Sequence, residues 1–294
     1  MAAARDILPP PRSPVPAPVG VKAWAGDLFQ TARFPDKRLN RRVREIARAF
    51  AAKPCDSIPQ TFDKWAGAKA TYRFIENKRV TCDGIKTPLS DAAGRACAGS
   101  SLVLAIQDST GLTFPKARSM EGLGALNETT QGILFHSTLA VAPDGQPLLL
   151  DLQWWARDPA QTGKTKRRKS RPIEEKESVK WLRGMRAARQ AFRANRPSLD
   201  EGRLIHVFDR EGDIHEVFEE IDPADEGAVI RCAQNRRALD SEGALSWSKY
   251  MVRSAPLLGV TTVDVPRSHG KPARAAVVEL RSCPLTLCPD KEKQ

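Results

Sequence analysis

The stretches SLVLAIQD (Ser101–Asp108) and RLIHVFD (Arg203–Asp209) decide the fold, because each is a short apolar run that ends in an aspartate. Runs of this length and composition are typical of buried strands. A strand that ends in a carboxylate holds that carboxylate on a fixed backbone where the chain meets solvent. If the two strands are neighbours in one sheet, Asp108 and Asp209 can converge on divalent cations, which prefer oxygen ligands.

The same two aspartates also have a simpler interpretation. An aspartate often ends a strand and caps the turn or helix that follows it. From the spacing of the two residues alone, this structural role is the more common outcome. Whether Asp108 and Asp209 are caps or metal ligands therefore has to be judged from the segments that surround them.

Further apolar runs extend the pattern along the chain. Together with Ser101–Asp108, they predict three strands in succession, which suggests a meander, and then two more strands that alternate with helices. The additional strands are Ile133–Ala142, Pro147–Trp155 and Gly227–Cys232, and the helices are Pro172 to about Ala194 and Ile214–Ile221. The basic segment Lys164–Arg171 is predicted to be a loop. The order β-β-β-α-β-α-β makes this part of the chain an α/β domain.

The parts before and after this domain differ from it. Residues 1–20 are proline-rich and lack an apolar period, which predicts a disordered leader. From Asp36 to Ala52 apolar residues recur at helical spacing, with Asp36 as the N-cap, and Lys64–Ile75 predicts a second helix. Beyond Asn235 the chain is rich in strand-forming residues, with the two best candidate strands at Val260–Val265 and Ala275–Leu280.

The charge balance indicates a polyanionic partner. The 294 residues include 47 lysines and arginines against 35 aspartates and glutamates, a formal charge of +12. Such an excess favours nucleic acid, although a cationic protein at a membrane surface would carry a similar charge. The sequence has no run of about 18 apolar residues, and its proline-rich N-terminus lacks the apolar core of a signal peptide. We therefore predict a cytoplasmic protein with no membrane partner.

Many segments of the chain, in order, resemble the transposases of bacterial insertion sequences of the IS-four type, the group of the Tn-five transposase. They are FPDKRLNRR (Phe34–Arg42), SIPQ and WAGAKATYRFIEN (within Ser57–Asn77), AIQDST (Ala105–Thr110), GLG (Gly122–Gly124), HSTLAV (His136–Val141), QWWAR (Gln153–Arg157), EEKESVKWL (Glu174–Leu182) and DREGDI (Asp209–Ile214). A single short match is weak, but so many in the same order are hard to attribute to chance.

The resemblance implies a DDE transposase, an enzyme that uses three acidic residues to cut and join DNA. It implies a helical domain that binds the transposon end (21–98), a catalytic domain of ribonuclease-H-like fold with a mixed sheet (99–234), and the start of a β-rich insertion (235–294). Asp108 would match the first catalytic aspartate and Asp209 the second. Both would bind catalytic Mg²⁺, or Mn²⁺ in its place, so that metal ions activate the attacking oxygen and stabilise the departing one.

The resemblance also implies contacts to double-stranded DNA, at the transposon ends and the target, and a homodimer on that DNA in the intact family member. The candidate DNA contacts are Arg38, Arg41, Arg42, Tyr72, Arg73, Arg210 and Arg231. A core position for Tyr72 is an equal alternative. Glu211 would support the aspartates or face DNA. Ala233 stands where the family often has a lysine, which weakens that contact.

The third acidic residue of the family does not appear in this sequence. Its signature is Tyr, two residues, Arg, three residues, Glu, six residues, Lys. Tyr250 and Arg253 fit the first half, but Leu257 stands where the glutamate is required, and Glu279 lies in a strand-like segment. We therefore predict a chain truncated at its C-terminal end, inside the insertion, with little or no strand cleavage.

Three functions stay open on the sequence. The first is a Mg²⁺-dependent transposase of cut-and-paste type that hydrolyses a phosphodiester at the element's end, joins the 3′-hydroxyl to target DNA and acts at the bacterial nucleoid. The second is a catalytically inactive DNA-binding remnant or regulator of an intact transposase. The third is an unrelated metal nuclease, which would require a third carboxylate near Asp108 and Asp209.

Overall fold

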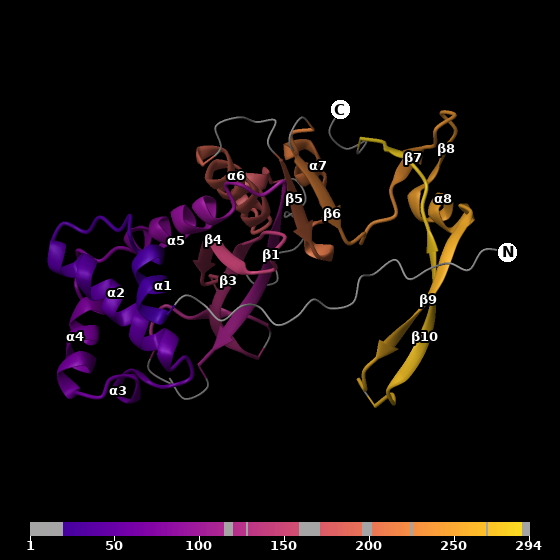
Figure 1. Ribbon diagram of the computed structural model, residues 1–294. Coiled ribbons are helices and arrows are strands. Elements are labelled where there is room, and N and C mark those ends of the chain that lie inside the picture. The colour runs from indigo at the N-terminus through magenta and orange to yellow at the C-terminus, as the bar shows by residue number, and fades with distance from the viewer. Residues whose placement is uncertain are drawn as a thin grey trace. The chain divides into compact units, whose positions relative to one another are not determined.

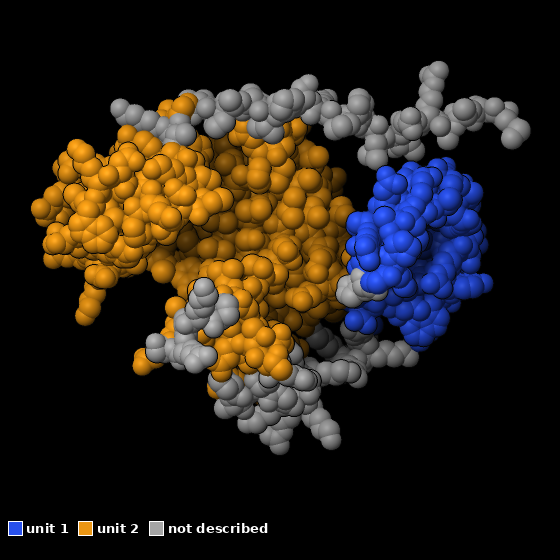
Figure 2. Space-filling view, turned by 90° about the horizontal axis from the view of Figure 1, so that it is seen from below, with its two compact units in different colours: residues 1–13, 232–294 blue, residues 14–231 orange. Residues whose placement is uncertain are grey.

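The computed structural model describes residues 20–114, 120–127, 129–158, 171–195, 202–223, 226–268 and 270–289. Except for Gly20 and Arg171, the predicted leader and the predicted basic loop lie outside these ranges. The chain forms two compact units, one of residues 14–231 and one that contains residues 232–294 (Figure 2).

The larger unit begins with a group of helices (Figure 1). They are α1 (Val21–Leu28), α2 (Lys37–Ala52), α3 (Ile58–Thr61), α4 (Trp65–Ile75) and α5 (Cys82–Ala96). Helices α2 and α4 confirm the two helices predicted here, and the Asp36 carboxylate caps α2 by accepting a hydrogen bond from the Arg38 amide. The rings of Phe34 and Phe74 meet edge-to-face in the core of this group, with centroids 5.7 Å apart.

A mixed six-stranded sheet follows the helices. Its strands are β1 (Leu102–Thr113), β2 (Gly124–Ala125), β3 (Gln131–Val141), β4 (Pro147–Trp155), β5 (Arg203–Phe208) and β6 (Glu226–Ile230). Antiparallel pairing of β1 with β3 and of β3 with β4 confirms the predicted meander. Pairing of β1 with β5 and of β5 with β6 is parallel. Apart from the two-residue β2, the order of strands and helices is the predicted one.

Helices α5 and α6 cover one face of this sheet. Helix α6 (Val179–Ala194) contacts β1, β3, β4 and β5, and α5 contacts β4 and α6. Their shared core includes Ala93 of α5, Phe192 of α6 and Leu204 of β5. Gly184 permits close approach of α6, because a β-carbon at this position would collide with Gln107 and Thr138. Since Ile85 and Leu89 of α5 also pack against the core of the N-terminal helices, α5 contributes to both cores.

Two boundaries around the sheet differ from the prediction. Helix α6 begins at Val179 instead of Pro172, because residues Ile173–Glu175 form a separate 3₁₀ turn, η3, and the backbone of Lys176 is extended. Strand β1 does not end at Asp108 but continues to Thr113, because β3 remains paired with it as far as Thr113. By contrast, the pairing of β1 with β5 extends only as far as Ile106.

The smaller unit consists of short strands, one helix and a long hairpin. Its elements are β7 (Arg237–Leu239), β8 (Leu245–Trp247), α8 (Ser248–Ser254), β9 (Leu257–Val265), β10 (Arg274–Arg281) and β11 (Thr286–Leu287). Strands β9 and β10 pair antiparallel and contain both strands predicted for this region. Strand β7 pairs with β8 and β11. Much of the hairpin surface is exposed, including Leu258 and Val277.

Candidate functional site

The parallel pairing of β1 and β5 brings the two predicted aspartates level with each other. The last paired residues are Ile106 and Val207. Continued by two residues, the same register sets Asp108 opposite Asp209. Neighbouring strands lie about 5 Å apart, so carboxylates at matched positions on one face can reach the same ion.

Burial shows which face the two aspartates share. Along β1 the buried residues are Val103, Ala105 and Gln107, and along β5 they are Leu204, His206 and Phe208. These residues point toward α6, and Asp108 and Asp209 follow them in the alternation, so both carboxylates lie on the opposite face. Both aspartates are exposed.

Asp209 follows the last residue of β5 and begins a turn. Its carboxylate Oδ1 accepts a hydrogen bond from the Glu211 amide at 2.9 Å, which caps the 3₁₀ turn η4 (Arg210–Gly212). The capping role considered for this residue is therefore present. It occupies one oxygen and leaves the other available, because within the described residues neither Asp209 nor Asp108 forms an ion pair.

Other predicted residues gather near the end of β5. Arg210 and Glu211 belong to η4, and the Arg231 amide donates to the Phe208 carbonyl at 3.1 Å, which holds the end of β6 beside the end of β5. The side chains of Arg210 and Arg231 are exposed. Glu211 is ion-paired with Lys180 of α6. The carboxylates of Asp108, Asp209 and Glu211 and the guanidinium groups of Arg210 and Arg231 thus lie at one end of the parallel strands.

A third metal-binding side chain is not assembled with them. Among the described residues, no group of three or more His, Cys, Asp or Glu side chains could hold a metal ion. Tyr250 and Arg253 lie on α8, and Glu279 lies in β10, all within the smaller unit. In the described part of the sheet domain, Asp108 and Asp209 are therefore the two candidate oxygen ligands.

The arginines predicted on α2 each have an acidic partner. Arg38 pairs with Asp36 at 2.8 Å, Arg42 with Glu45 at 2.7 Å, and Arg41 with Glu45 at 3.7 Å. The hydrogen bond from the Arg38 guanidinium lowers the pKa of the Asp36 carboxyl. Exposed pairs of this kind contribute little to stability, so phosphate groups can compete for these arginines.

Helix α4 carries several exposed side chains. Tyr72 and Arg73 are exposed, whereas Phe74 is buried, so Tyr72 does not occupy the core position considered for it. Lys69 and Trp65 lie one and two turns earlier on the same side of the helix and are also exposed. Neither residue is among the DNA contacts predicted from the sequence, although their helical spacing from Tyr72 and Arg73 was the available signal.

The N-terminal helices are also where a known family is found. Residues 21–80 match the family model Transposase DNA-binding. The match covers α1 to α4 and supports a transposase with DNA as its partner. It includes the basic side of α2 and the exposed side of α4, so the candidate DNA contacts on both helices fall inside the transposase DNA-binding match.

A cleft elsewhere in the larger unit has a different character. It measures about 550 Å³ and is lined by residues of β4, η3 and α6, among them Trp154 and Arg183. Four basic and four acidic side chains line it, so their charges balance and give phosphate no advantage. No helix in the described ranges has both the length and the apolar character needed to cross a membrane.

Proposed function

We propose that this chain is a DNA transposase of cut-and-paste type, in which Asp108 and Asp209 bind Mg²⁺ and the N-terminal helices bind the transposon end. The observation that carries the proposal is the parallel register of β1 and β5, which pairs Ile106 with Val207 and, continued by two residues, sets Asp108 and Asp209 level on one face of the sheet. A catalytic site of this kind needs both carboxylates on a rigid support. The transposase DNA-binding match supplies the DNA partner.

The topology supports a ribonuclease-H-like fold for the sheet domain. Three antiparallel strands, β1, β3 and β4, are followed by helix α6 and two parallel strands, β5 and β6, in the order that the family resemblance implies. Asp108 lies on the central strand of this arrangement and Asp209 follows its parallel neighbour. The two residues implied by the resemblance are therefore the two that the register makes level.

The chemistry of these residues fits a hard divalent cation. Both carboxylates are exposed oxygen donors, which Mg²⁺ and Mn²⁺ prefer. When bound, such a cation would neutralise charge on a phosphate and activate the attacking oxygen. The exposed guanidinium groups of Arg210 and Arg231 can hold phosphate oxygens nearby, which orients the DNA strand without taking part in bond breaking.

Metal binding by the full chain tests this proposal. We expect Asp108→Asn and Asp209→Asn each to weaken Mn²⁺ binding, measured by electron paramagnetic resonance, by at least the 10–100-fold typical for loss of a residue that supports a ligand. Each should also abolish any Mg²⁺-dependent nicking of DNA that carries the element's terminal inverted repeats. Asp144→Asn, in the turn between β3 and β4, is the matched control. Equal Mn²⁺ affinity in all three variants would refute the metal site.

A second candidate function is DNA binding without cleavage, as a remnant or regulator of an intact transposase. It is favoured by the lack of a three-residue acidic group in the described part of the chain. Tight binding to the terminal repeats without nicking, together with reduced transposition on co-expression with an intact relative, would support it. Equal affinity for terminal repeats and random DNA would count against both functions.

The exposed surface of α4 gives a separate prediction about DNA affinity. We expect Arg73→Ala and Lys69→Ala each to reduce the slope of log affinity against log salt by about 0.9, the loss of one phosphate contact. Gel-shift titrations at several salt concentrations would measure the slope. Arg183→Ala, at an exposed position of α6 outside the transposase DNA-binding match, is the control and should leave the slope unchanged. Equal slopes in all three variants would exclude α4 as the contact surface.

A further inference from the structure

A buried lysine lies behind the two aspartates. The Lys180 side chain, on α6, is 10% exposed, and its ammonium donates to Glu211 Oε2 at 2.9 Å. The same ammonium lies 5.6 Å from the centroid of the Trp155 ring and 5.5 Å from that of Trp181. A buried ammonium is costly unless it is paired. One carboxylate and two aromatic rings therefore hold this charge in a fixed place.

Glu211 connects this lysine to Asp209. Its carboxylate accepts the hydrogen bond from Lys180, and its backbone amide donates to Asp209 Oδ1. The turn η4 is thus fastened to α6 by the side chain of Glu211, while its backbone orients the Asp209 carboxylate. Loss of the Lys180 charge would free the Glu211 side chain and loosen this turn.

The residues on either side of Asp108 are held by a histidine on β3. His136 Nε2 lies 2.9 Å from Gln107 Oε1, and His136 Nδ1 lies 2.9 Å from Ser109 Oγ. Since Gln107 Oε1 can only accept, Nε2 donates to it, and Nδ1 is left to accept from the Ser109 hydroxyl. Burial, together with the charge of Lys180, lowers the pKa of His136 to about 3, so the imidazole is neutral near pH 7.

Trp181 joins these two sets of contacts. Its ring meets His136 edge-on, with centroids 4.6 Å apart, and lies 5.0 Å from the ring of Phe208, the residue before Asp209. Trp181 is only 1% exposed. Lys180, Trp181 and His136, called the positioning cluster from here on, therefore contact neighbours of both aspartates from the opposite face of the sheet.

We propose that the positioning cluster fixes the geometry of Asp108 and Asp209, and that Lys180 sets the orientation of Asp209 through Glu211. The proposal rests on the proposed function, because it assumes that the two aspartates bind a metal ion. Ligands must be held to within about 0.5 Å of their productive positions. Residues that orient metal ligands typically change metal affinity about 10–100-fold when removed.

Two variants test the positioning role in the full chain. Lys180→Met keeps an unbranched chain between the tryptophans but removes the charge, and Glu211→Gln keeps the size of its partner. We expect each to weaken Mn²⁺ binding about 10–100-fold, and the double variant to bind no more weakly than either single one. Hydrogen exchange of the Glu211 amide, measured without metal, should become faster in Lys180→Met. Arg183→Met, at an exposed position of the same helix, is the control for removing a cation.

The outcomes separate the two proposals. If Lys180→Met and Glu211→Gln bind Mn²⁺ as Arg183→Met does while Asp209→Asn does not bind it, the positioning role is wrong and the metal site stands. If Asp108→Asn and Asp209→Asn bind Mn²⁺ as the unchanged protein does, the metal site itself is wrong. If Lys180→Met does not fold, Glu211→Gln carries the test, because the Glu211 side chain is 64% exposed and tolerates substitution.

Discussion

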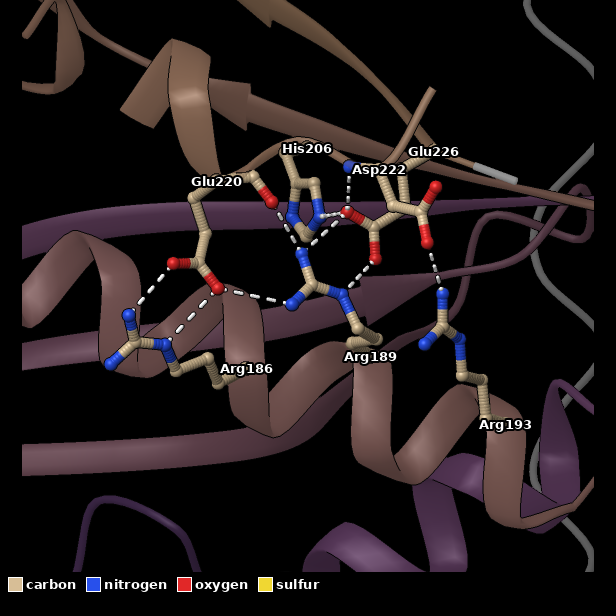
Figure 3. A network of polar contacts seen from close by, with 7 residues as sticks. All are labelled: Arg186, Arg189, Arg193, His206, Glu220, Asp222 and Glu226. Carbon is tan, nitrogen blue, oxygen red and sulfur yellow. Dashed lines mark hydrogen bonds and ion pairs between the residues drawn. The ribbon is translucent and has the colours of Figure 1, made fainter. Parts of the chain in front are cut away.

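Replacing Arg189 by methionine is expected to lower the free energy of unfolding at pH 7 by about 3–5 kcal/mol, because it leaves a buried carboxylate without its partner. Arg189 of α6 donates to Glu226 Oε2 of β6 at 2.8 Å and to the Glu220 carbonyl, in α7 (His215–Glu220), at 2.7 Å (Figure 3). The Glu226 side chain is 1% exposed. The network therefore fastens α6 to the edge strand β6, which pairs with β5, the strand that Asp209 follows.

The size of this loss should depend on pH. Burial raises the pKa of Glu226, but the hydrogen bonds from Arg189 and other neighbours outweigh it and lower the pKa to about 2. Without Arg189, burial dominates and the pKa of Glu226 rises, so the carboxyl can be neutralised by a proton in mild acid. Urea denaturation followed by circular dichroism should therefore show a smaller difference between the variant and the unchanged protein at pH 4 than at pH 7.

A neighbouring arginine on the same helix provides the matched control. Arg186 pairs with Glu220 at 2.7 Å, but its side chain is 54% exposed. Because exposed ion pairs contribute about 1 kcal/mol or less, Arg186→Met should cost far less than Arg189→Met. Adding Glu226→Gln to Arg189→Met should recover part of the loss. Equal losses in the two arginine variants would show that the buried pair is not what stabilises this edge.

The strands of the sheet could be predicted because their apolar residues are local in sequence. The runs that end at Asp108 and Asp209 became β1 and β5, and the meander of β1, β3 and β4 followed from three runs in succession. The ends of the strands were harder to predict from the sequence. Strand β1 extends to Thr113 because β3 supplies hydrogen bonds beyond Asp108, and that pairing partner is distant in sequence.

Helix α5 shows a second limit of local sequence patterns. It contains Pro88 in its interior, which weighs against a helix, although Thr81 is an N-cap and Ile85, Leu89 and Ala93 recur at helical spacing. The helix forms because packing supplies what propensity does not. Its residues Ile85 and Leu89 pack with the N-terminal helices, and Ala93 packs against the sheet.

The candidate site, like the fold, could be predicted from the sequence only in part. Asp108 and Asp209 follow two apolar runs, but it was the family resemblance that implied a metal-binding role for them; the register of β1 with β5, continued by two residues, sets them level. The residues behind them could not be assigned roles in advance. Lys180, Trp181 and His136 stand in segments that resemble the family, but their contacts to Glu211, Phe208 and Gln107 arise only when α6 lies across the sheet.

The stability of the fold should fall as pH drops below about 6.5, and His136 is the main cause at first. Its pKa is about 3 in the folded protein against an ordinary value of 6.5. Between these values the unfolded chain binds a proton that the folded protein does not, so stability falls with falling pH by up to about 1.4 kcal/mol per pH unit. Below pH 4.5 the lowered pKa of Glu226 acts in the same direction.

Urea denaturation at intervals between pH 7 and 4.5 measures this slope. His136→Gln removes the titrating group at a position with hydrogen-bonding neighbours. The slope of unfolding free energy against pH, between pH 6.5 and 4.5, should therefore decrease by about 1.4 kcal/mol per pH unit, the value for one proton. The matched control is His215→Gln, on α7, where the side chain is 22% exposed and pairs with Glu219. If His136→Gln keeps the slope of the unchanged protein, the neutral imidazole is not what limits stability in mild acid. In that case the contacts of His136 with Gln107 and Ser109 would have to survive its protonation, with the Ser109 hydroxyl oxygen accepting a hydrogen bond from the protonated Nδ1.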